Sequence, residues 1–505
     1  DIPRYLGPFI MAEKDRPVRV KFYNLLPKGA GGDLFIPVDT TVMGSGMGPI
    51  DMPGMPGMKE SYTQNRATLH LHGGRTPWIS DGTAHQWITP AGEDTVYPKG
   101  VSVYNVPDMP DPGPGAMTFF YTNQQSARLM FYHDHSYGIT RLNVYAGEAA
   151  GYLLTDNIEK ALIADLLIPA DQIPLIIQDK TFVPDNTVPI TNMWGTFSSQ
   201  LAFQDPTWDT TMWGGPGSLW YPHVYMTMQN PGDPSGMNTF GRWQYGPWFW
   251  PPTVVEQGPI PNPYYPGGPL YSPTYPYNHL EPAMIPGTPN ISMPGEAFMD
   301  TPVINGIAYP YLEVEPKAYR FRILNAADDR FFNLQIYVAD SSVTTFDGRT
   351  NTEVKMVPAV LTPGFPEGWP TDGREGGVPD PATAGPSFIQ IGNEGGFLPA
   401  PVVLPMQPVD WNMDQGTFDF GLVNKYTLLL GTAERADVIV DFSAFAGKTL
   451  ILYNDCPAPV PASDPRQDYY TGKPDQTDSG GSPSTIPGYG PNTRTIMQIR
   501  VADSP

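Results

Sequence analysis

Cysteine is almost absent from this sequence of 505 residues, and charged residues are few. Cys456 is the one cysteine, so no disulfide can form within the chain. Asp and Glu number 51 against 29 Lys and Arg, which gives a net charge of −22 although charged residues make up only 16% of the chain. Such an acidic chain repels nucleic acid and anionic membranes and is compatible with attracting cations. No apolar run approaches the roughly 18 residues that a membrane-spanning helix needs, so we expect neither a membrane span nor a nucleic-acid partner.

Proline and glycine, by contrast, are abundant. The 61 prolines and 52 glycines favour a loop-rich β architecture over a helix bundle. At this length we expect two or more domains with sizeable cores.

Histidine is scarce as well, yet four of the seven histidines form two copies of one pattern. His70-Leu71-His72 and His133-Asp134-His135 each lie in an apolar or aromatic run that is typical of a buried strand. Side chains at positions i and i+2 of a strand share one face and lie roughly 6.6–6.8 Å apart, so each pair directs two imidazoles into the same space. Leu69 and Leu71 would then point the other way, into a core. Two such pairs in matching contexts predict a metal site.

The ligand type alone does not choose the metal, because neutral imidazole binds copper, zinc, iron and nickel. Zinc hydrolases also carry His-x-His on strands, but their His-x-His-x-Asp-His motif is absent here. The flanking residues are more specific. Residues 70–77 and 80–82, together with residues 132–136 and 140–147, resemble the first-domain copper motifs of multicopper oxidases, in particular those of the bacterial spore-coat laccase and bilirubin oxidase branch.

In that family, four coppers lie between a first and a third cupredoxin domain. A type 1 copper takes electrons from the substrate and passes them to a trinuclear cluster that reduces O₂ to water. The resemblance implies that His70 is a type 2 copper ligand, and that His72, His133 and His135 are type 3 copper ligands. It also implies that Asp81 serves proton delivery near the cluster; the alternative for Asp81 is a turn residue before the glycine that follows it.

The family's third domain should bring the motifs His-Pro-x-His-x-His and His-Cys-His-x-x-x-His, and neither is present. Cys456 has no neighbouring histidine and is therefore not the type 1 thiolate. The unpaired His85, His223 and His279 are expected to be ordinary surface or packed residues. Because the sequence stops where a second domain would meet a third, we expect a laccase-like oxidase that works only with a polypeptide carrying the third cupredoxin domain and its type 1 copper.

The resemblance covers nearly the whole chain outside two insertions. It implies an all-β fold of two cupredoxin-like Greek-key β-sandwiches. Residues 1–157 would form the first domain, 158–171 a linker and 172–505 the second domain. Long insertions rich in Pro, Gly and Trp would interrupt the second domain at about 187–296 and 350–385.

An internal repeat agrees with two copies of one sandwich. Residues 311–325 weakly repeat the pattern of residues 18–24. The N-terminal stretch resembles the second and third strands of a first cupredoxin domain. One strand has therefore either been trimmed or comes from elsewhere.

Two segments have no place in this scheme. Residues 43–58 put five methionines in a Gly/Pro-rich loop, where they either handle copper, because thioethers select Cu(I), or pack flexibly on neighbouring surface. Residues 187–296 hold seven of the eleven tryptophans. That composition argues against disorder, and the insertion either packs on a partner surface or covers its own domain.

Two other function classes stay open at this stage. One is a structural or interaction protein of an extracellular assembly that kept the cupredoxin shells, and the other is a copper-binding protein that relies on the methionine loop. Retention of all four paired histidines favours the oxidase. Its reducing substrate is not predictable, because the type 1 site that meets it is missing, so phenols, bilirubin-like pigments and metal ions such as Mn(II) all remain. The family implies a secreted, periplasmic or cell-surface location.

Overall fold

Strands dominate the part of the chain that the structure, a computed structural model, describes. The described residues are 5–504 without position 41, residues 101–108, most of 184–297, single positions between 413 and 426, and residues 458–459, 461–467 and 475–483. His223, His279 and most of the Trp-rich segment lie outside them. Two α-helices occur in the described part, α1 (Thr140–Ala146) and α2 (Asn157–Ala164), and none of its helices is long and apolar enough to cross a membrane. The all-β fold class is therefore confirmed.

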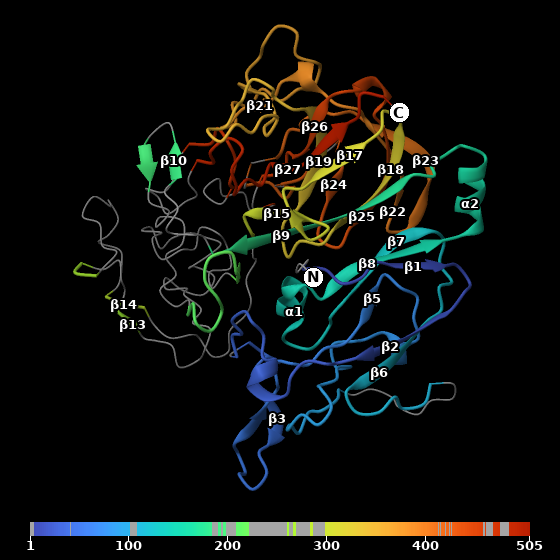
Figure 1. The fold of residues 1–505 in the computed structure, drawn as a ribbon, viewed down its shortest axis with the longest axis vertical. Helices are drawn as coiled ribbons and strands as arrows, with labels where there is room; N and C mark the ends of the chain where they lie inside the picture. The colour runs from blue at the N-terminus through green and yellow to red at the C-terminus, as the bar shows by residue number, and fades with distance from the viewer. Residues whose placement is uncertain are drawn as a thin grey trace.

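The first β-sandwich packs a four-stranded sheet against a two-stranded one (Figure 1). The larger sheet has the order β1 (Ile10–Glu13), β8 (Ala149–Thr155), β7 (Arg128–His133) and β5 (His70–His72), and the smaller sheet pairs β2 (Val18–Tyr23) with β6 (Ala116–Tyr121). Strand β2 alternates half-buried and exposed residues, as a strand with one face on a core should. Leu69 and Leu71 lie in the core between the sheets, as predicted.

The second β-sandwich is larger and is built from two sheets that enclose the main hydrophobic core. One sheet has the order β16 (Ile307–Ala308), β15 (Thr301–Ile304), β9 (Gln172–Phe182), β18 (Ala318–Asn325), β25 (Arg435–Asp441), β22 (Phe388–Asn393) and β23 (Gly396–Leu404), with β12 (Leu219–Trp220) also paired to β9. The other has the order β17 (Tyr311–Val314), β27 (Thr495–Val501), β26 (Thr449–Asn454), β19 (Phe332–Val338) and β24 (Leu429–Leu430). The pair of sandwiches agrees with the expected architecture, while the boundaries at 157 and 172 stay a prediction.

The two sandwiches share a topology. The order β1-β8-β7-β5 in the first matches β17-β27-β26-β19 in the second, and in each case the first two strands of the order pair in parallel. All other pairs in these two runs are antiparallel. The weak repeat between residues 18–24 and 311–325 therefore lies at corresponding places in two copies of one fold.

One buried asparagine marks the repeat in each copy. Asn24 directly follows β2, and Asn325 is the last residue of β18. In each residue the side-chain nitrogen donates to two carbonyl oxygens, and the side-chain oxygen accepts from the backbone N–H two residues further on. The carbonyl partners are those of Asn65 and Ile88 for Asn24, and those of Arg330 and Leu430 for Asn325. Each amide thus ties the end of one strand to two other segments.

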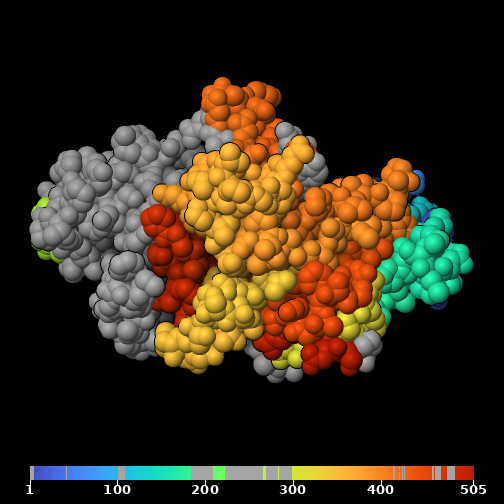
Figure 2. Space-filling view, turned by 90° about the horizontal axis from the view of Figure 1, so that it is seen from above, coloured from blue at the N-terminus to red at the C-terminus, as the bar shows by residue number. Residues whose placement is uncertain are grey.

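The two sandwiches meet at a buried ion cluster and an apolar contact. Glu159 on α2 pairs with Arg320 and Arg322 of β18, which also pair with Asp437 of β25, and both guanidinium groups are buried. Apolar residues of β7 pack with residues of β9 and β18. From above, the surface consists mainly of residues of the second sandwich, coloured yellow to red, with the teal segment that includes α2 at its edge (Figure 2). Helix α2 therefore anchors the joint between the sandwiches.

Candidate metal centre

The histidine pairs are brought together because β5 and β7 are antiparallel neighbours. In their register His70 lies opposite His133, and His72 lies opposite Phe131. Strand β5 is the outer strand of its sheet, so the imidazoles gather at an edge of the first sandwich. The first and second pairs, sixty residues apart in the sequence, thus converge on one place, as predicted.

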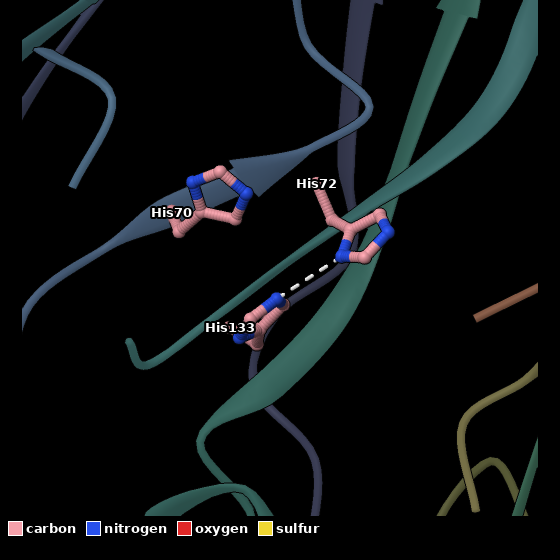
Figure 3. A group of neighbouring side chains, drawn as sticks. All are labelled: His70, His72 and His133. Carbon is pink, nitrogen blue, oxygen red and sulfur yellow. Dashed lines mark hydrogen bonds between the residues drawn. The ribbon is translucent and has the colours of Figure 1, made fainter. Parts of the chain in front are cut away.

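The four imidazoles form a single cluster. The ring centroid of His70 lies 5.9, 5.3 and 5.0 Å from those of His72, His133 and His135, and the centroid of His133 lies 5.5 Å from that of His72 and 5.6 Å from that of His135. One ring nitrogen from each of His70, His72 and His133 lies within 4.8 Å of the other two (Figure 3). The cluster is dense enough to hold metal ions.

His135 reaches the cluster differently from the way that the strand pattern predicts. Strand β7 ends at His133, and the buried Asp134 turns the chain by accepting hydrogen bonds from the N–H groups of Thr68 and Ser136 at 2.8 and 2.9 Å. The prediction that both histidines of this pair lie on one strand is therefore wrong for His135. Its ring still joins the cluster, with its centroid 5.0 Å from that of His70.

The hydrogen bonds of the histidines set which nitrogens are free. Nδ1 of His70 lies 2.6 Å from the carbonyl oxygen of Asp81, and Nδ1 of His133 lies 2.5 Å from that of Asp134. Since a carbonyl can only accept, both Nδ1 atoms carry the proton and both Nε2 atoms keep a lone pair. Nδ1 of His72 faces Nε2 of His133 at 3.2 Å, and Nδ1 of His135 is buried without a hydrogen-bond partner in the described part of the chain.

Burial keeps two of the imidazoles neutral. It lowers the pKa of His133 to about 3, with the neighbouring histidines adding to the shift, and it lowers the pKa of His72 to about 4, with the charge of Arg435 as the next cause. At neutral pH both rings are therefore in the unprotonated form that binds metal ions.

Phe131 packs against the cluster, and Arg435 packs against Phe131. The ring of Phe131 stacks on His72, with 4.4 Å between centroids and 20° between planes. The guanidinium of Arg435, on β25 of the second sandwich, lies 5.8 Å from the centroid of Phe131 and donates to the carbonyl of Leu129. A Cβ at Gly73 would lie 2.9 Å from Nη2 of Arg435, so the residue after His72 leaves room for this contact.

The sequence contains only part of the signal for these supporting residues. Phe131 stands two residues before His133 on one strand, so strand alternation places both on one face. Arg435 lies some 300 residues further along the chain, and no local pattern connects it with His72.

Asp81 lies at the edge of the cluster. It follows the short 3₁₀ turn Trp78–Ser80, and its Oδ1 accepts a hydrogen bond from Oγ1 of Thr76 at 2.7 Å and lies 3.7 Å from Nδ1 of His70. A Cβ at Gly82 would lie 2.1 Å from the carbonyl oxygen of Leu69, so the turn requires glycine there. The proton-delivery role of Asp81 stays a prediction.

His85 is exposed, and its ring lies 4.9 Å from that of Tyr137. Cys456 is buried. In the described part of the chain, the one group of three or more such residues close enough to hold a metal ion is that of His70, His72 and His133.

The chain is similar in sequence to laccases. It is 27% identical to the laccase of Bacillus stratosphericus over 450 residues, which are 89% of this chain and 51% of that protein, and 26% identical to the laccase of Bacillus subtilis over the same shares. The bilirubin oxidase of Albifimbria verrucaria is 37% identical over 93 residues, 17% of this chain and 16% of that enzyme. These relatives confirm the resemblance to multicopper oxidases. The chain spans about half the length of the curated laccases that it matches.

A variant of the McoA multicopper oxidase of Aquifex aeolicus aligns with 98% of this chain and 55% of its own, at 17% identity and a TM-score of 0.43. No family model matches the chain.

Proposed function

We propose that this chain supplies the first two domains of a multicopper oxidase and, with its four paired histidines, one half of the trinuclear copper site that reduces O₂ to water. The observation that carries the proposal is the convergence of four imidazoles from β5, β7 and the turn after β7 at one sheet edge. The other ligands and the type 1 copper would come from residues beyond these 505, in the same protein or in a second polypeptide.

The donor set fits copper. His70 would be the type 2 ligand, and His72, His133 and His135 would be type 3 ligands. Nδ1 of His72 and Nε2 of His133 lie 3.2 Å apart, close enough for both to hold one copper ion. We therefore assign these two nitrogens to the same ion.

Bound copper would pass four electrons, taken from the reducing substrate at the type 1 copper, to O₂, whose reduction to water also consumes four protons. The chain's own contribution is to hold neutral imidazoles in place: carbonyl groups of Asp81 and Asp134 fix two rings through their Nδ1–H groups. The partly exposed carboxyl group of Asp81 would carry protons at Oδ1 from solvent toward the cluster, 3.7 Å from His70.

The first test is made on the chain by itself. Loaded with Cu(II), it should bind copper weakly and show no oxygen uptake with a phenol, bilirubin or Mn(II), because it offers half of the ligands and no type 1 thiolate. Adding a polypeptide with the His-Cys-His motif should restore copper content and turnover. Turnover by the chain alone at the rate of a complete oxidase would refute the division of the site.

The second test is made on the assembled enzyme. His72→Ala and His133→Ala should abolish O₂ reduction while the type 1 copper stays reducible by the substrate. His85→Ala, which changes an exposed histidine outside the cluster, is the control and should leave oxygen consumption unchanged. Near-normal oxygen consumption in either cluster variant would show that the assigned roles are wrong.

A further inference from the structure

The methionine-rich segment forms a hairpin on the first sandwich. Strands β3 (Met47–Asp51) and β4 (Lys59–Ser61) pair in antiparallel fashion, with Asp51 opposite Lys59. The hairpin projects at the bottom of the view, away from the sheets (Figure 1). Its tip, residues 52–58, has the sequence Met-Pro-Gly-Met-Pro-Gly-Met.

The tip consists of two successive β-turns, and a methionine is the first and the last residue of each turn. The N–H of Met55 donates to the carbonyl of Met52 at 3.0 Å, and the N–H of Met58 donates to that of Met55 at 3.1 Å. Gly54 and Gly57, third in each turn, have φ of +76° and +87°, as type II turns with proline second require. The N–H of Met52 then donates to the carbonyl of Met58 at 2.7 Å and closes the tip.

This backbone brings three methionines into a small triangle. The first and last Cα atoms of a β-turn lie within about 7 Å, and the hydrogen bond from the N–H of Met52 to the carbonyl of Met58 holds the remaining two close together. Met52, Met55 and Met58 are therefore neighbours in all three combinations. Their unbranched side chains have three rotatable bonds each, so the three sulfur atoms can reach one point above the triangle.

Packing does not account for two of these side chains, since Met55 is 49% exposed and Met58 is 56% exposed at the end of a hairpin that projects from its sandwich. Met52 is half-buried. The nearest charged groups, Asp51 and Lys59, pair with each other at 2.6 Å and leave the tip electrically neutral. An exposed group of thioethers without charged ligands would exclude hard cations and accept soft ones.

The base of the hairpin is fixed to the rest of the sandwich. A Cβ at Gly44 would lie 2.6 Å from the ring of Tyr137, and one at Gly138 would lie 2.1 Å from the backbone of Gly44. The N–H of Ile50 donates to the hydroxyl of Tyr97 at 2.7 Å. The base of the hairpin thus packs against residues that follow His135, and this contact fixes the position of the tip.

We propose that Met52, Met55 and Met58 form a three-thioether site for one soft monovalent ion, Cu(I), with Ag(I) as its redox-inert equivalent. The site shares no residue with the histidine cluster and stands or falls independently of the function proposed above. Met43 and Met47, which are also exposed but lie outside the turns, are not part of it.

The test is a titration of the full chain with Ag(I), followed through the methyl signals of ¹³C-methyl-labelled methionine by NMR. We expect one equivalent to shift the signals of Met52, Met55 and Met58 and to leave those of Met43 and Met47 unmoved. The same equivalent should bind in the His72→Ala/His133→Ala variant, which separates this site from the imidazoles. Unmoved signals at the three tip methionines would overturn the proposal.

Variants give a second measurement. Because even a group that only orients a metal ligand is worth roughly 10- to 100-fold in affinity, Met55→Leu should weaken Ag(I) binding at least tenfold. The triple change of Met52, Met55 and Met58 to leucine should remove the site, and Cu(I) should then be lost to a chelator that the parent chain resists. Met43→Leu/Met47→Leu is the matched control and should bind as the parent does. Equal binding by the triple variant and the control would also overturn the proposal.

Discussion

Equivalent strands of the two sandwiches, β7 and β26, end in related sequences, but the side chains at the two strand ends have different roles. Strand β7 leads into Tyr132-His133-Asp134-His135, and β26 leads into Tyr453-Asn454-Asp455-Cys456. The registers correspond, because His70 lies opposite His133 on the neighbouring strand in the first sandwich and Leu334 lies opposite Asn454 in the second. We call residues 132–135 the first corner and residues 453–456 the second corner. The first corner thus carries imidazoles, and the second carries an asparagine and a thiol.

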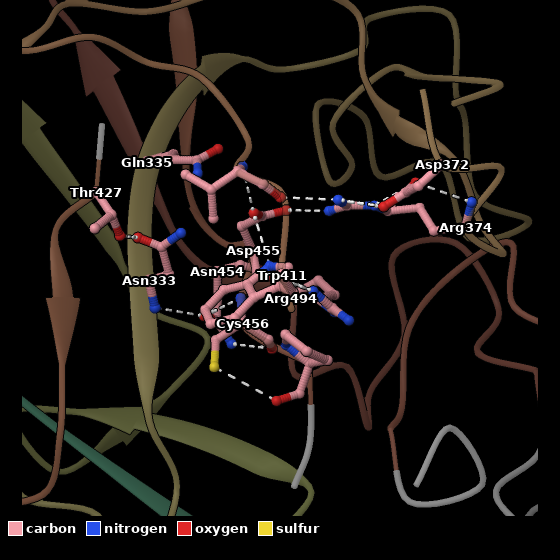
Figure 4. A network of polar contacts seen from close by, with 12 residues as sticks. Asn333, Gln335, Asp372, Arg374, Trp411, Thr427, Asn454, Asp455, Cys456 and Arg494 are labelled. Atoms are coloured by element: carbon pink, nitrogen blue, oxygen red, sulfur yellow. Dashed lines mark hydrogen bonds and ion pairs between the residues drawn. The ribbon is translucent and has the colours of Figure 1, made fainter. Parts of the chain in front are cut away.

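In the second sandwich the polar groups of this corner bond to one another (Figure 4). Oδ1 of Asn454 accepts from the N–H groups of Asn333 and Cys456 at 2.9 and 3.0 Å, and Nδ2 donates to the carbonyl of Thr493 at 3.0 Å. Burial raises the pKa of the Cys456 thiol, so the thiolate that would bind a metal is disfavoured. The corner is closed and structural.

The aspartate is buried in both corners. Asp134 accepts from the backbone of Thr68 and Ser136, whereas Asp455 accepts from the N–H of Val409 and from Nε1 of Trp411 and lies 3.6 Å from Arg374. A buried carboxylate therefore follows the strand in each copy and ties it to another segment of the chain. What differs is whether the side chains on either side of this aspartate use all their polar atoms in hydrogen bonds within the protein or keep ring nitrogens free for a metal ion.

The largest effect should come from the joint that holds the two copies together. Glu159→Gln leaves two buried guanidinium groups with only Asp437, and breaking a buried pair in this way costs about 3–5 kcal/mol of the free energy of unfolding. Urea denaturation measures it. The control is Glu315→Gln, the exposed partner of Lys317, which should cost far less because solvent screens an exposed pair. Equal costs would mean that the buried cluster does not join the sandwiches.

Exchanging residues between the corners tests whether the first corner binds copper and the second only stabilises the fold. Asn454→His should lower the free energy of unfolding by about 3 kcal/mol, because the N–H groups of Asn333 and Cys456 lose their acceptor, and it should gain no copper. His133→Asn should lower the same free energy by only about 1 kcal/mol, the value of one hydrogen bond, yet lose copper binding. Denaturant titration and metal analysis of both variants decide the matter; copper binding by Asn454→His would contradict it.

The buried asparagines test whether the two sandwiches are copies. Asn24→Leu and Asn325→Leu should each lower the free energy of unfolding by about 2 kcal/mol, because each change leaves two carbonyls and one N–H without the amide that pairs them. Urea denaturation of the two variants side by side is the measurement. A neutral result at one position would show that the amides are not equivalent.

The smallest expected effect concerns the contact between the second sandwich and the first corner. Arg435→Met should weaken copper binding roughly tenfold, because the support of His72 through Phe131 is loosened, in line with other residues that orient metal ligands. The exposed Arg500 provides the control as Arg500→Met. Copper affinity and the free energy of unfolding are measured together, and a loss of stability with unchanged affinity would leave Arg435 a purely structural residue.

The sequence predicted what depends on local spacing and missed what depends on register. The i, i+2 pattern of His70 and His72, with Leu69 and Leu71 facing the core, follows from strand alternation and was found in the structure. The end of β7 at His133 was not predictable, because one of the two backbone hydrogen bonds that Asp134 accepts there comes from Thr68, on a separate segment.

The correspondence of the two corners was also missed. Tyr453-Asn454-Asp455-Cys456 shares only its tyrosine and aspartate with Tyr132-His133-Asp134-His135. Two identical residues in four are too weak a signal without the shared strand order. Domain boundaries, the role of Asp81 and the source of the type 1 copper stay predictions.

The most direct test of the central claim is an anomalous difference map from a crystal of this chain soaked in Cu(II) and measured at the copper edge. We expect density among His70, His72, His133 and His135 and none beside Asn454 and Cys456. Density at the second corner, or its absence at the four histidines, would contradict the assignment of one corner to metal and the other to structure.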